Sequence, residues 1–285
     1  MNSLVFKISW RLVLYPAFFY AVLSFFFFWL YVHPRRNVGN SRPEDFKLKP
    51  EELKLVTADG VQLDAWFILH RTSKKTVIVC HGYPMDKSDV LGMTSFLADD
   101  FSLLYFDFRA TGKSGGFFAT GGAREVRDID AAIKFLEARG SGAVGLFGFS
   151  MGGATSLLSQ NPAVKARVLD APYADLPGEL DYIFGHWGIF RKPLVAMMKG
   201  WSFILMGVNI NSVRPVKNTA AFSKPMLLIH GDADTQVPVE NSLAIKAANP
   251  AAELWVVKGA GHGESRYRSD GEYEKRVTAF FKKNL

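Results

Sequence analysis

The stretch Val144–Gly153 reads VGLFGFSMGG, a short apolar run followed at once by small residues around a single serine. Its first four residues are typical of a strand covered on both faces, and Met151–Gln160 has helical spacing. Ser150 is therefore expected on a sharp strand-to-helix turn. Such a turn needs small neighbours, here Gly148 and Gly152, and it presents the serine at a helix N-terminus, which stabilises developing negative charge. We expect Ser150 to be a nucleophile.

Two later loops carry the base and the acid that a serine nucleophile needs. Asp234 lies in His230–Pro238, directly after the apolar run Met226–Ile229. His262 stands between glycines shortly after the apolar run Leu254–Val257. Parallel strands in an open α/β sheet bind ligands at their carboxyl ends, so the three side chains are expected to converge at one edge. The chain order serine, acid, histidine is the one expected for this architecture.

Other residues compete for these roles. Asp232 lies in the same loop as Asp234 but is equally suited to capping the turn, and Asp170 ends an earlier strand candidate. The simpler interpretation of His262 is a histidine on a surface loop. His81 also follows a strand candidate, and there we expect an orienting or structural histidine rather than a second base.

The rest of the chain alternates strand and helix patterns. Leu53–Leu69 is predicted to be a β-hairpin that turns at Asp59-Gly60. Further strands are expected over residues 76–80, 103–106, 144–147, 167–169, 226–229 and 254–257, and further helices over residues 124–139 and 241–248. This alternation predicts an α/β fold with a mostly parallel central sheet and helices on both faces.

Residues 172–222 interrupt the alternation with helix-prone segments rich in Trp, Phe and Met. An insertion of this length between two strands is unusual unless it has a function. We expect a helical lid with an apolar underside, because methionine-rich surfaces adapt to apolar ligands. The alternative is an ordinary helical insertion buried against the sheet.

The N-terminal segment Leu12–Val32 carries no charge. As a helix of about 21 residues it would be about 31 Å long, which matches the hydrocarbon core of a bilayer. A cleaved signal peptide and a buried core helix are the alternatives. No small-x-small cleavage site follows the segment, and it has no polar face. We therefore expect a transmembrane anchor over residues 1–36, a linker over 37–50 and the α/β domain over 51–285.

Charge and composition narrow the possible partners. The net charge of +7 suits either nucleic acid or an anionic lipid surface. No nucleic-acid module is recognisable and no metal-ligand spacing is present, so we expect neither nucleic acid nor metal. The single cysteine excludes an internal disulfide. More basic residues follow the apolar segment than precede it, which slightly favours a cytoplasmic catalytic domain.

From about Glu51 to Leu285 the chain resembles the α/β-hydrolase fold. It is similar to bacterial membrane-anchored serine hydrolases described as serine aminopeptidase-like, so the bacterial inner membrane is the expected location. The motifs that carry the resemblance are His81-Gly82, Asp107-x-Arg109-x-x-Gly112-x-Ser114, the serine turn and the two loops described above. The resemblance implies an oxyanion hole from the main-chain amides of Tyr83 and Met151. Ala110 departs from the glycine common in the second motif.

These observations predict a serine hydrolase that works through an acyl-enzyme and needs no cofactor. The catalytic residues are expected to be Ser150, Asp234 and His262, and the substrate a small-molecule or lipid-like ester or thioester with an apolar acyl group. The N-terminal helix would contact membrane lipid. A peptidase of the serine aminopeptidase type remains an alternative, as does a membrane-tethered binding protein without turnover.

Overall fold

An eight-stranded sheet forms the centre of the structure, a computed structural model that describes residues 2–220 and 222–285, with side chains from residue 10 onward. The strand order is β1-β2-β4-β3-β5-β6-β7-β8; β1 and β2 are antiparallel to their neighbours, and the remaining pairs are parallel. The strands are β1 (Glu51–Val56), β2 (Gln62–Ile68), β3 (Thr76–Cys80), β4 (Ser102–Phe106), β5 (Val144–Phe149), β6 (Val164–Asp170), β7 (Met226–Gly231) and β8 (Glu253–Val257). Their carboxyl ends, from β3 to β8, therefore share one edge.

Apolar side chains of the central strands alternate between the two faces of the sheet. In β3, Val77 and Val79 pack with α2 (Leu91–Thr94) and α9 (Glu272–Asn284), whereas Ile78 and Cys80 pack with helices on the opposite face. That opposite face is covered by α3 (Val126–Ala138), α4 (Met151–Leu158) and α8 (Glu240–Ala248). The fully buried strands explain why their sequences are continuously apolar.

The predicted fold class is confirmed: the sheet is mostly parallel, with helices on both faces and an antiparallel hairpin at its start. Several strands extend one to three residues beyond the expected bounds, and β5 and β6 are examples. β5 continues through Gly148 and Phe149 because both residues still pair with β6, and β6 begins at Val164 rather than at residue 167. In β6 the exposed Lys165 interrupts the apolar pattern, and in β5 the glycine Gly148 interrupts it, which hid the extra pairing.

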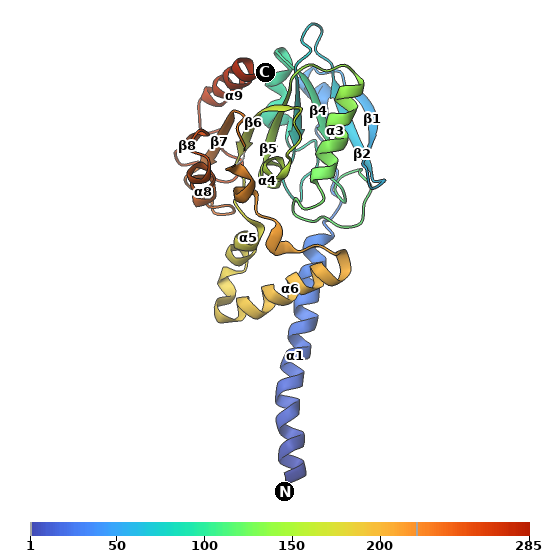
Figure 1. Cartoon of the computed structure of the whole chain (residues 1–285), viewed down its shortest axis with the longest axis vertical. Coiled ribbons are helices and arrows are strands. Elements are labelled where there is room, and N and C mark those ends of the chain that lie inside the picture. Colours follow the sequence, from blue (N-terminus) through green and yellow to red (C-terminus); the bar gives the residue numbers. More distant parts are fainter. Residues whose placement is uncertain (1, 221) are drawn as a thin grey trace.

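Between β6 and β7 the described residues form helices and no strand. They are α5 (Leu176–Ile183), α6 (Arg191–Met206), α7 (Pro215–Thr219) and the 3₁₀ helices Gly185–Phe190 and Ile210–Ser212. Two more 3₁₀ helices lie at Pro43–Phe46 and Ser95–Asp99. In Figure 1, α5 and α6 lie at the end of the α/β domain from which the N-terminal helix projects.

Helix α1 (Asn2–Val32) extends well beyond the domain, while its C-terminal part contacts α6 (Figure 1). Its segment Trp10–Val32 is long and apolar enough to cross a membrane, a property that signal sequences share. Most side chains of the segment Trp10–Val32 are exposed, in contrast to those of a core helix.

Candidate active site

Ser150 lies on the turn between β5 and α4, as the sequence predicts. Its φ of 51° and ψ of −118° lie outside the regions that ordinary residues favour. The turn is held by a 2.8 Å hydrogen bond from the Ser150 amide to the carbonyl oxygen of Asp170 and by a 3.0 Å bond from the Ala154 amide to the Ser150 carbonyl. The side chain therefore has a fixed position at the carboxyl edge of the sheet.

The glycines beside Ser150 are required by the close approach of α4 to the sheet. A Cβ atom added at Gly152 would lie 2.2 Å from the carbonyl oxygen of Cys80, and one at Gly148 would lie 2.6 Å from Gly153 Cα. Real Cβ atoms do not come this close to backbone atoms. Any side chain at either position would push the helix away from β3 and β5 and move Ser150.

The structure brings Ser150, His262 and Asp234 together. His262 Nε2 lies 3.1 Å from Ser150 Oγ, and His262 Nδ1 lies 2.7 Å from Asp234 Oδ2. Because an ionised carboxylate only accepts hydrogen bonds, the proton of a neutral His262 resides on Nδ1, and Nε2 is left to accept from the serine hydroxyl. This is the hydrogen-bond relay that a serine nucleophile, a base and an orienting acid require.

Asp234 is held in its ionised form. Burial acts to raise the pKa of Asp234, but hydrogen bonds from His262 and from the amides of Gln236 and Val237 outweigh it, so the pKa lies below its ordinary value. Both amides donate to Oδ1 at 2.9 Å, which leaves Oδ2 for the imidazole. The loop after β7 thus holds the Asp234 carboxylate in position and also stabilises its ionised form.

The two competing acids do not reach His262. Asp232 is exposed and accepts a 2.6 Å hydrogen bond from the Gly259 amide, which ties the two loops together. Asp170 is fully buried and accepts from Tyr273 Oη at 2.8 Å and from Ser265 Oγ at 3.2 Å. Burial raises the pKa of Asp170 to about 6 against the effect of these two donors.

His230 supports the acid loop, a role that was not predicted from the sequence. It is fully buried, and its Nε2 lies 2.8 Å from the Val237 carbonyl oxygen and 3.6 Å from Asp234 Oδ2. Its Nδ1 lies 2.7 Å from Ser242 Oγ in α8. Its position as the first residue of the predicted acid loop was the available signal.

His81 is a structural histidine, as expected. Its Nε2 accepts a hydrogen bond from the Phe108 amide at 2.9 Å, so the ring proton is on Nδ1, which donates to the Gly82 carbonyl at 2.6 Å. Burial lowers the pKa of His81. The neutral ring joins the loops after β3 and β4.

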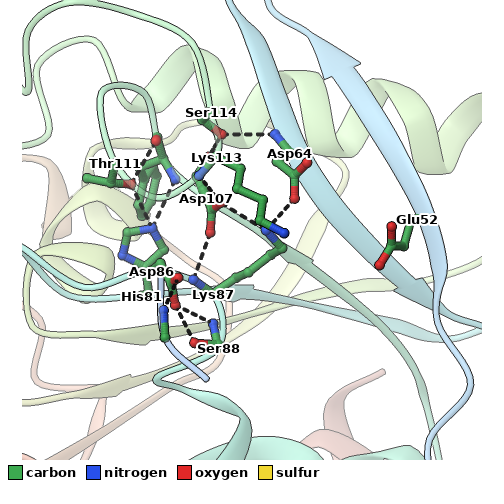
Figure 2. A network of polar contacts seen from close by, with 12 residues as sticks. Glu52, Asp64, His81, Asp86, Lys87, Ser88, Asp107, Thr111, Lys113 and Ser114 are labelled. Atoms are coloured by element: carbon green, nitrogen blue, oxygen red, sulfur yellow. Dashed lines mark hydrogen bonds and ion pairs between the residues drawn. The ribbon is translucent and has the colours of Figure 1, made fainter. Parts of the chain in front are cut away.

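A buried polar network supports those same two loops (Figure 2). Lys87 Nζ lies 2.9 Å from Asp107 Oδ2 and 2.5 Å from Asp64 Oδ1, and the Asp107 carboxylate also accepts from the amides of Lys87 and Lys113. Ser114 Oγ donates to the Asp107 carbonyl oxygen at 2.6 Å. The network fixes the chain just beyond Tyr83.

The amides of Tyr83 and Met151 are unpaired within the described part of the chain, and both residues line the cavity that holds Ser150 and His262. Two free N–H groups beside a serine nucleophile are what an oxyanion hole consists of. Met151 is the first residue of α4, so its amide is one of the four that a helix N-terminus leaves without a partner.

The cavity has a volume of about 1200 Å³, more than the roughly 300–1,000 Å³ of common small-molecule sites. Its walls come from the loops that follow β3, β5, β7 and β8, from α5 and α6, and from the C-terminal part of α1. The sequence predicted a helical lid with an apolar underside over residues 172–222, and it did not predict that α1 lines the same cavity. No cluster of metal-ligating side chains is present among the described residues.

Glu179 of α5 also lines this cavity and was not anticipated from the sequence. It is 7% exposed, and its Oε2 has no hydrogen-bond partner among the described residues. Burial, with the nearby charges of Asp234 and Asp175, raises the pKa of Glu179 to about 7. A helical lid sequence offers no pattern that marks one acidic residue as inward-facing.

Comparisons with known proteins agree with this architecture. The sequence model of the prolyl oligopeptidase family matches residues 90–285. Esterase Pf2001 of Pyrococcus furiosus superposes with a TM-score of 0.75 at 31% identity, over 89% of this chain and 98% of that one. The uncharacterized protein YqkD of Bacillus subtilis is 26% identical over 234 residues, which cover 79% of this chain and 76% of YqkD. The uncharacterized peptidase YuxL of the same organism is 23% identical over 83% of this chain and 39% of YuxL.

The chain is therefore a hydrolase with the α/β-hydrolase fold, as the sequence resemblance implied. Within that class it belongs to the prolyl oligopeptidase family, whose matched region spans β4 to β8 and contains all three residues of the relay.

Proposed function

We propose that the chain is a serine hydrolase in which Ser150, His262 and Asp234 form the catalytic triad. The observation that carries the proposal is the continuous relay from Ser150 Oγ through the imidazole to the Asp234 carboxylate, at 3.1 and 2.7 Å. Only a base within hydrogen-bond reach makes a serine hydroxyl nucleophilic near neutral pH.

The chemistry follows from this geometry. Ser150 Oγ attacks the substrate carbonyl while its proton passes to His262 Nε2, and Asp234 stabilises the imidazolium that forms. The carbonyl oxygen becomes an oxyanion held by the amides of Tyr83 and Met151. The imidazolium then protonates the leaving group, which departs and leaves an acyl-enzyme. Water attacks that ester with His262 again as the base, and Ser150 is released.

The proposed substrate is an ester or thioester with an apolar acyl group. Two observations support it: the cavity walls from α1 and α6 are rich in Phe, Tyr and Met, and a similar structure is an esterase from Pyrococcus furiosus. Peptide substrates are the alternative, because the family takes its name from an oligopeptidase and YuxL is called a peptidase. The leaving group, and not the triad, distinguishes the two.

A fluorophosphonate probe tests the triad, because it labels only an activated serine. We expect labelling of the wild type, no labelling of Ser150→Ala, and unchanged labelling of Ser212→Ala, whose serine is exposed and outside the cavity. A well-folded wild type that stays unlabelled would overturn the proposal in favour of a non-catalytic binding protein.

Substrate profiling tests the ester assignment. p-Nitrophenyl esters of increasing acyl length are compared with aminoacyl p-nitroanilides at equal concentration. We expect ester hydrolysis that improves as the acyl chain lengthens. Cleavage of the anilides alone would replace the ester proposal with the peptidase.

We further propose that α1 anchors the enzyme in the bacterial inner membrane, with the catalytic domain on the cytoplasmic side. Support comes from the apolar segment Trp10–Val32, the exposure of its large side chains, and the basic residues Arg35, Arg36 and Arg42 that follow it. Alkaline carbonate extraction tests the anchor, since an integral protein stays in the pellet. A reporter fused after Leu285 that is active only outside the cytoplasm would reverse the orientation.

A further inference from the structure

The C-terminal part of α1 is packed into the enzyme. Phe28 and Val32 are 3% and 8% exposed and share an apolar cluster with Leu194 of α6. Trp201, also in α6, donates a 3.0 Å hydrogen bond from Nε1 to Ser24 Oγ. A helix that served only as a tether would not need these contacts.

The same part of α1 forms one wall of the cavity that holds Ser150. The apolar residues that it contributes are Phe27, Phe28, Leu30, Tyr31 and Val32. The Phe27 ring packs edge-on against Phe184 and Trp187 of the lid, with ring centroids 5.3 and 5.5 Å apart. The Tyr31 carbonyl accepts a 2.6 Å hydrogen bond from Tyr83 Oη, so α1 also contacts the turn that carries the proposed oxyanion amide.

These wall residues lie at membrane depth if α1 spans the bilayer. They are the last residues of the segment Trp10–Val32, whose 23 residues make a helix of about 34 Å against a hydrocarbon core of about 30 Å. Phe27–Val32 would therefore lie inside the hydrocarbon or at its edge. The side of α1 that faces away from the enzyme carries large exposed apolar side chains, which need lipid around them.

The lid presents a second apolar surface at the same end of the molecule. Phe203, Ile204 and Leu205 of α6 are all exposed, and so are Ile189 and Phe190 in the 3₁₀ helix before it. Both segments lie between the α/β domain and the projecting part of α1 (Figure 1). An exposed apolar surface of this kind beside a membrane helix is suited to contact with the bilayer.

We infer that the cavity takes its substrate sideways from the bilayer: a long-chain acyl ester of a membrane glycerolipid, whose chain lies between α1 and α6 while its ester carbonyl reaches Ser150. The inference rests on the proposed function and names where the acyl chain binds. Phe27 and Met198 both line the cavity, and contact with them removes methylenes of the chain from water. Helix α1 is then both the anchor and a wall of the acyl site.

A photoreactive probe tests the position of the chain directly. Full-length protein in phosphatidylethanolamine–phosphatidylglycerol vesicles is labelled with a fluorophosphonate whose long alkyl chain carries a terminal diazirine, irradiated and digested. We expect the peptides that hold residues 27–32 or 194–206 to be cross-linked. Cross-links found only in other parts of the chain would overturn the inference. A wild type that the probe does not label at Ser150 would instead overturn the proposed triad.

Substitutions in α1 give a second test. Phe27→Ala removes a wall residue, whereas Phe19→Ala removes an exposed aromatic side chain of the same helix that lies outside the cavity. For monooleoylglycerol or lysophosphatidylglycerol in vesicles, we expect kcat/KM of Phe27→Ala to fall about tenfold to a hundredfold and that of Phe19→Ala to stay within about twofold.

The soluble ester p-nitrophenyl acetate serves as the reference substrate for both variants. Its hydrolysis should change little in Phe19→Ala, and Phe27→Ala should lose much less on it than on the vesicle substrates, because a two-carbon acyl group makes far less contact with α1 than a long chain does. Equal losses with the two variants, or equal losses on the vesicle and soluble substrates, would overturn the inference. Comparison of the two lipids separates recognition of the acyl chain from recognition of an anionic headgroup.

Discussion

The hydroxyl of Tyr83 donates a hydrogen bond of 2.6 Å to the carbonyl oxygen of Tyr31, in the last turn of α1. The last carbonyls of a helix have no partner within it, so Tyr83 satisfies one that α1 would otherwise leave open. The bond joins the membrane-side helix to the turn after β3, which carries the proposed oxyanion amide.

Replacement of Tyr83 by Phe should loosen this junction and keep the main-chain amide. We expect Tyr83→Phe to lower the free energy of unfolding by about 0.5–1.5 kcal/mol, the usual net value of one hydrogen bond. Thermal unfolding in detergent micelles measures the effect. Tyr267→Phe is the matched control, because that side chain is 70% exposed. Identical midpoints for the two variants would contradict the role given to the Tyr83 hydroxyl.

Replacement of Asp234 by Asn should cripple turnover without unfolding the protein. An amide at this position no longer holds the Nδ1 proton of His262 with a negative charge, so the tautomer that accepts the serine proton is lost. We expect kcat for a p-nitrophenyl ester to fall by about 10⁴.

Asp232→Asn is the control for that substitution. Its side-chain oxygen can still accept the hydrogen bond from the Gly259 amide, and kcat should stay within about twofold of the wild type. If Asp232→Asn were the variant that lost activity, the assignment of the acid would be wrong.

Glu179 should make stability depend on pH. Its pKa is raised from the ordinary 4.5 to about 7, so between these values the folded state holds a proton that the unfolded state releases. Stability contributed by the neutral carboxyl is therefore present below about pH 4.5 and lost as the pH rises through 7. We expect Glu179→Gln to be more stable than the wild type at pH 8, by on the order of 1–3 kcal/mol.

Denaturant unfolding at several pH values checks this prediction. The advantage of Glu179→Gln should shrink towards pH 4.5, whereas Glu137→Gln, at an exposed position on α3, should follow the wild type throughout. An advantage of Glu179→Gln that is the same at every pH would mean that the carboxyl does not titrate in this range.

Lys87 should be far more important for stability than its neighbour in the same network, Lys54. The Lys87 side chain is 3% exposed and pairs with Asp107, whose side chain is fully buried, so Lys87→Met leaves an uncompensated charge. We expect a loss of about 3–5 kcal/mol in urea unfolding. Lys54 also pairs with Asp64 but is 52% exposed, and Lys54→Met should cost less than about 1 kcal/mol. Comparable losses would mean that the Lys87–Asp107 pair is open to water.

Local sequence determined much of the fold and the candidate nucleophile. Strands buried on both faces must be continuously apolar, and a serine between glycines after such a strand can only be accommodated on a tight turn. The bounds of β3 and the position of Ser150 were therefore predicted residue by residue, and those of β5 except for its last two residues. The loops of Asp234 and His262 were readable because each follows a strand whose carboxyl end reaches the same edge.

Contacts between segments far apart in the chain were decided only by the tertiary structure. Of the three acids near the edge, geometry alone selects Asp234, because Asp232 bonds to Gly259 and Asp170 bonds to Tyr273. The burial of Glu179 and the place of Phe27 in the wall of the cavity that holds Ser150 depend on how α1, α5 and α6 pack. An apolar pattern indicates that a helix face must be covered, but it does not indicate whether lipid or protein covers it. The sequence therefore predicted a membrane helix but not that this helix lines the cavity.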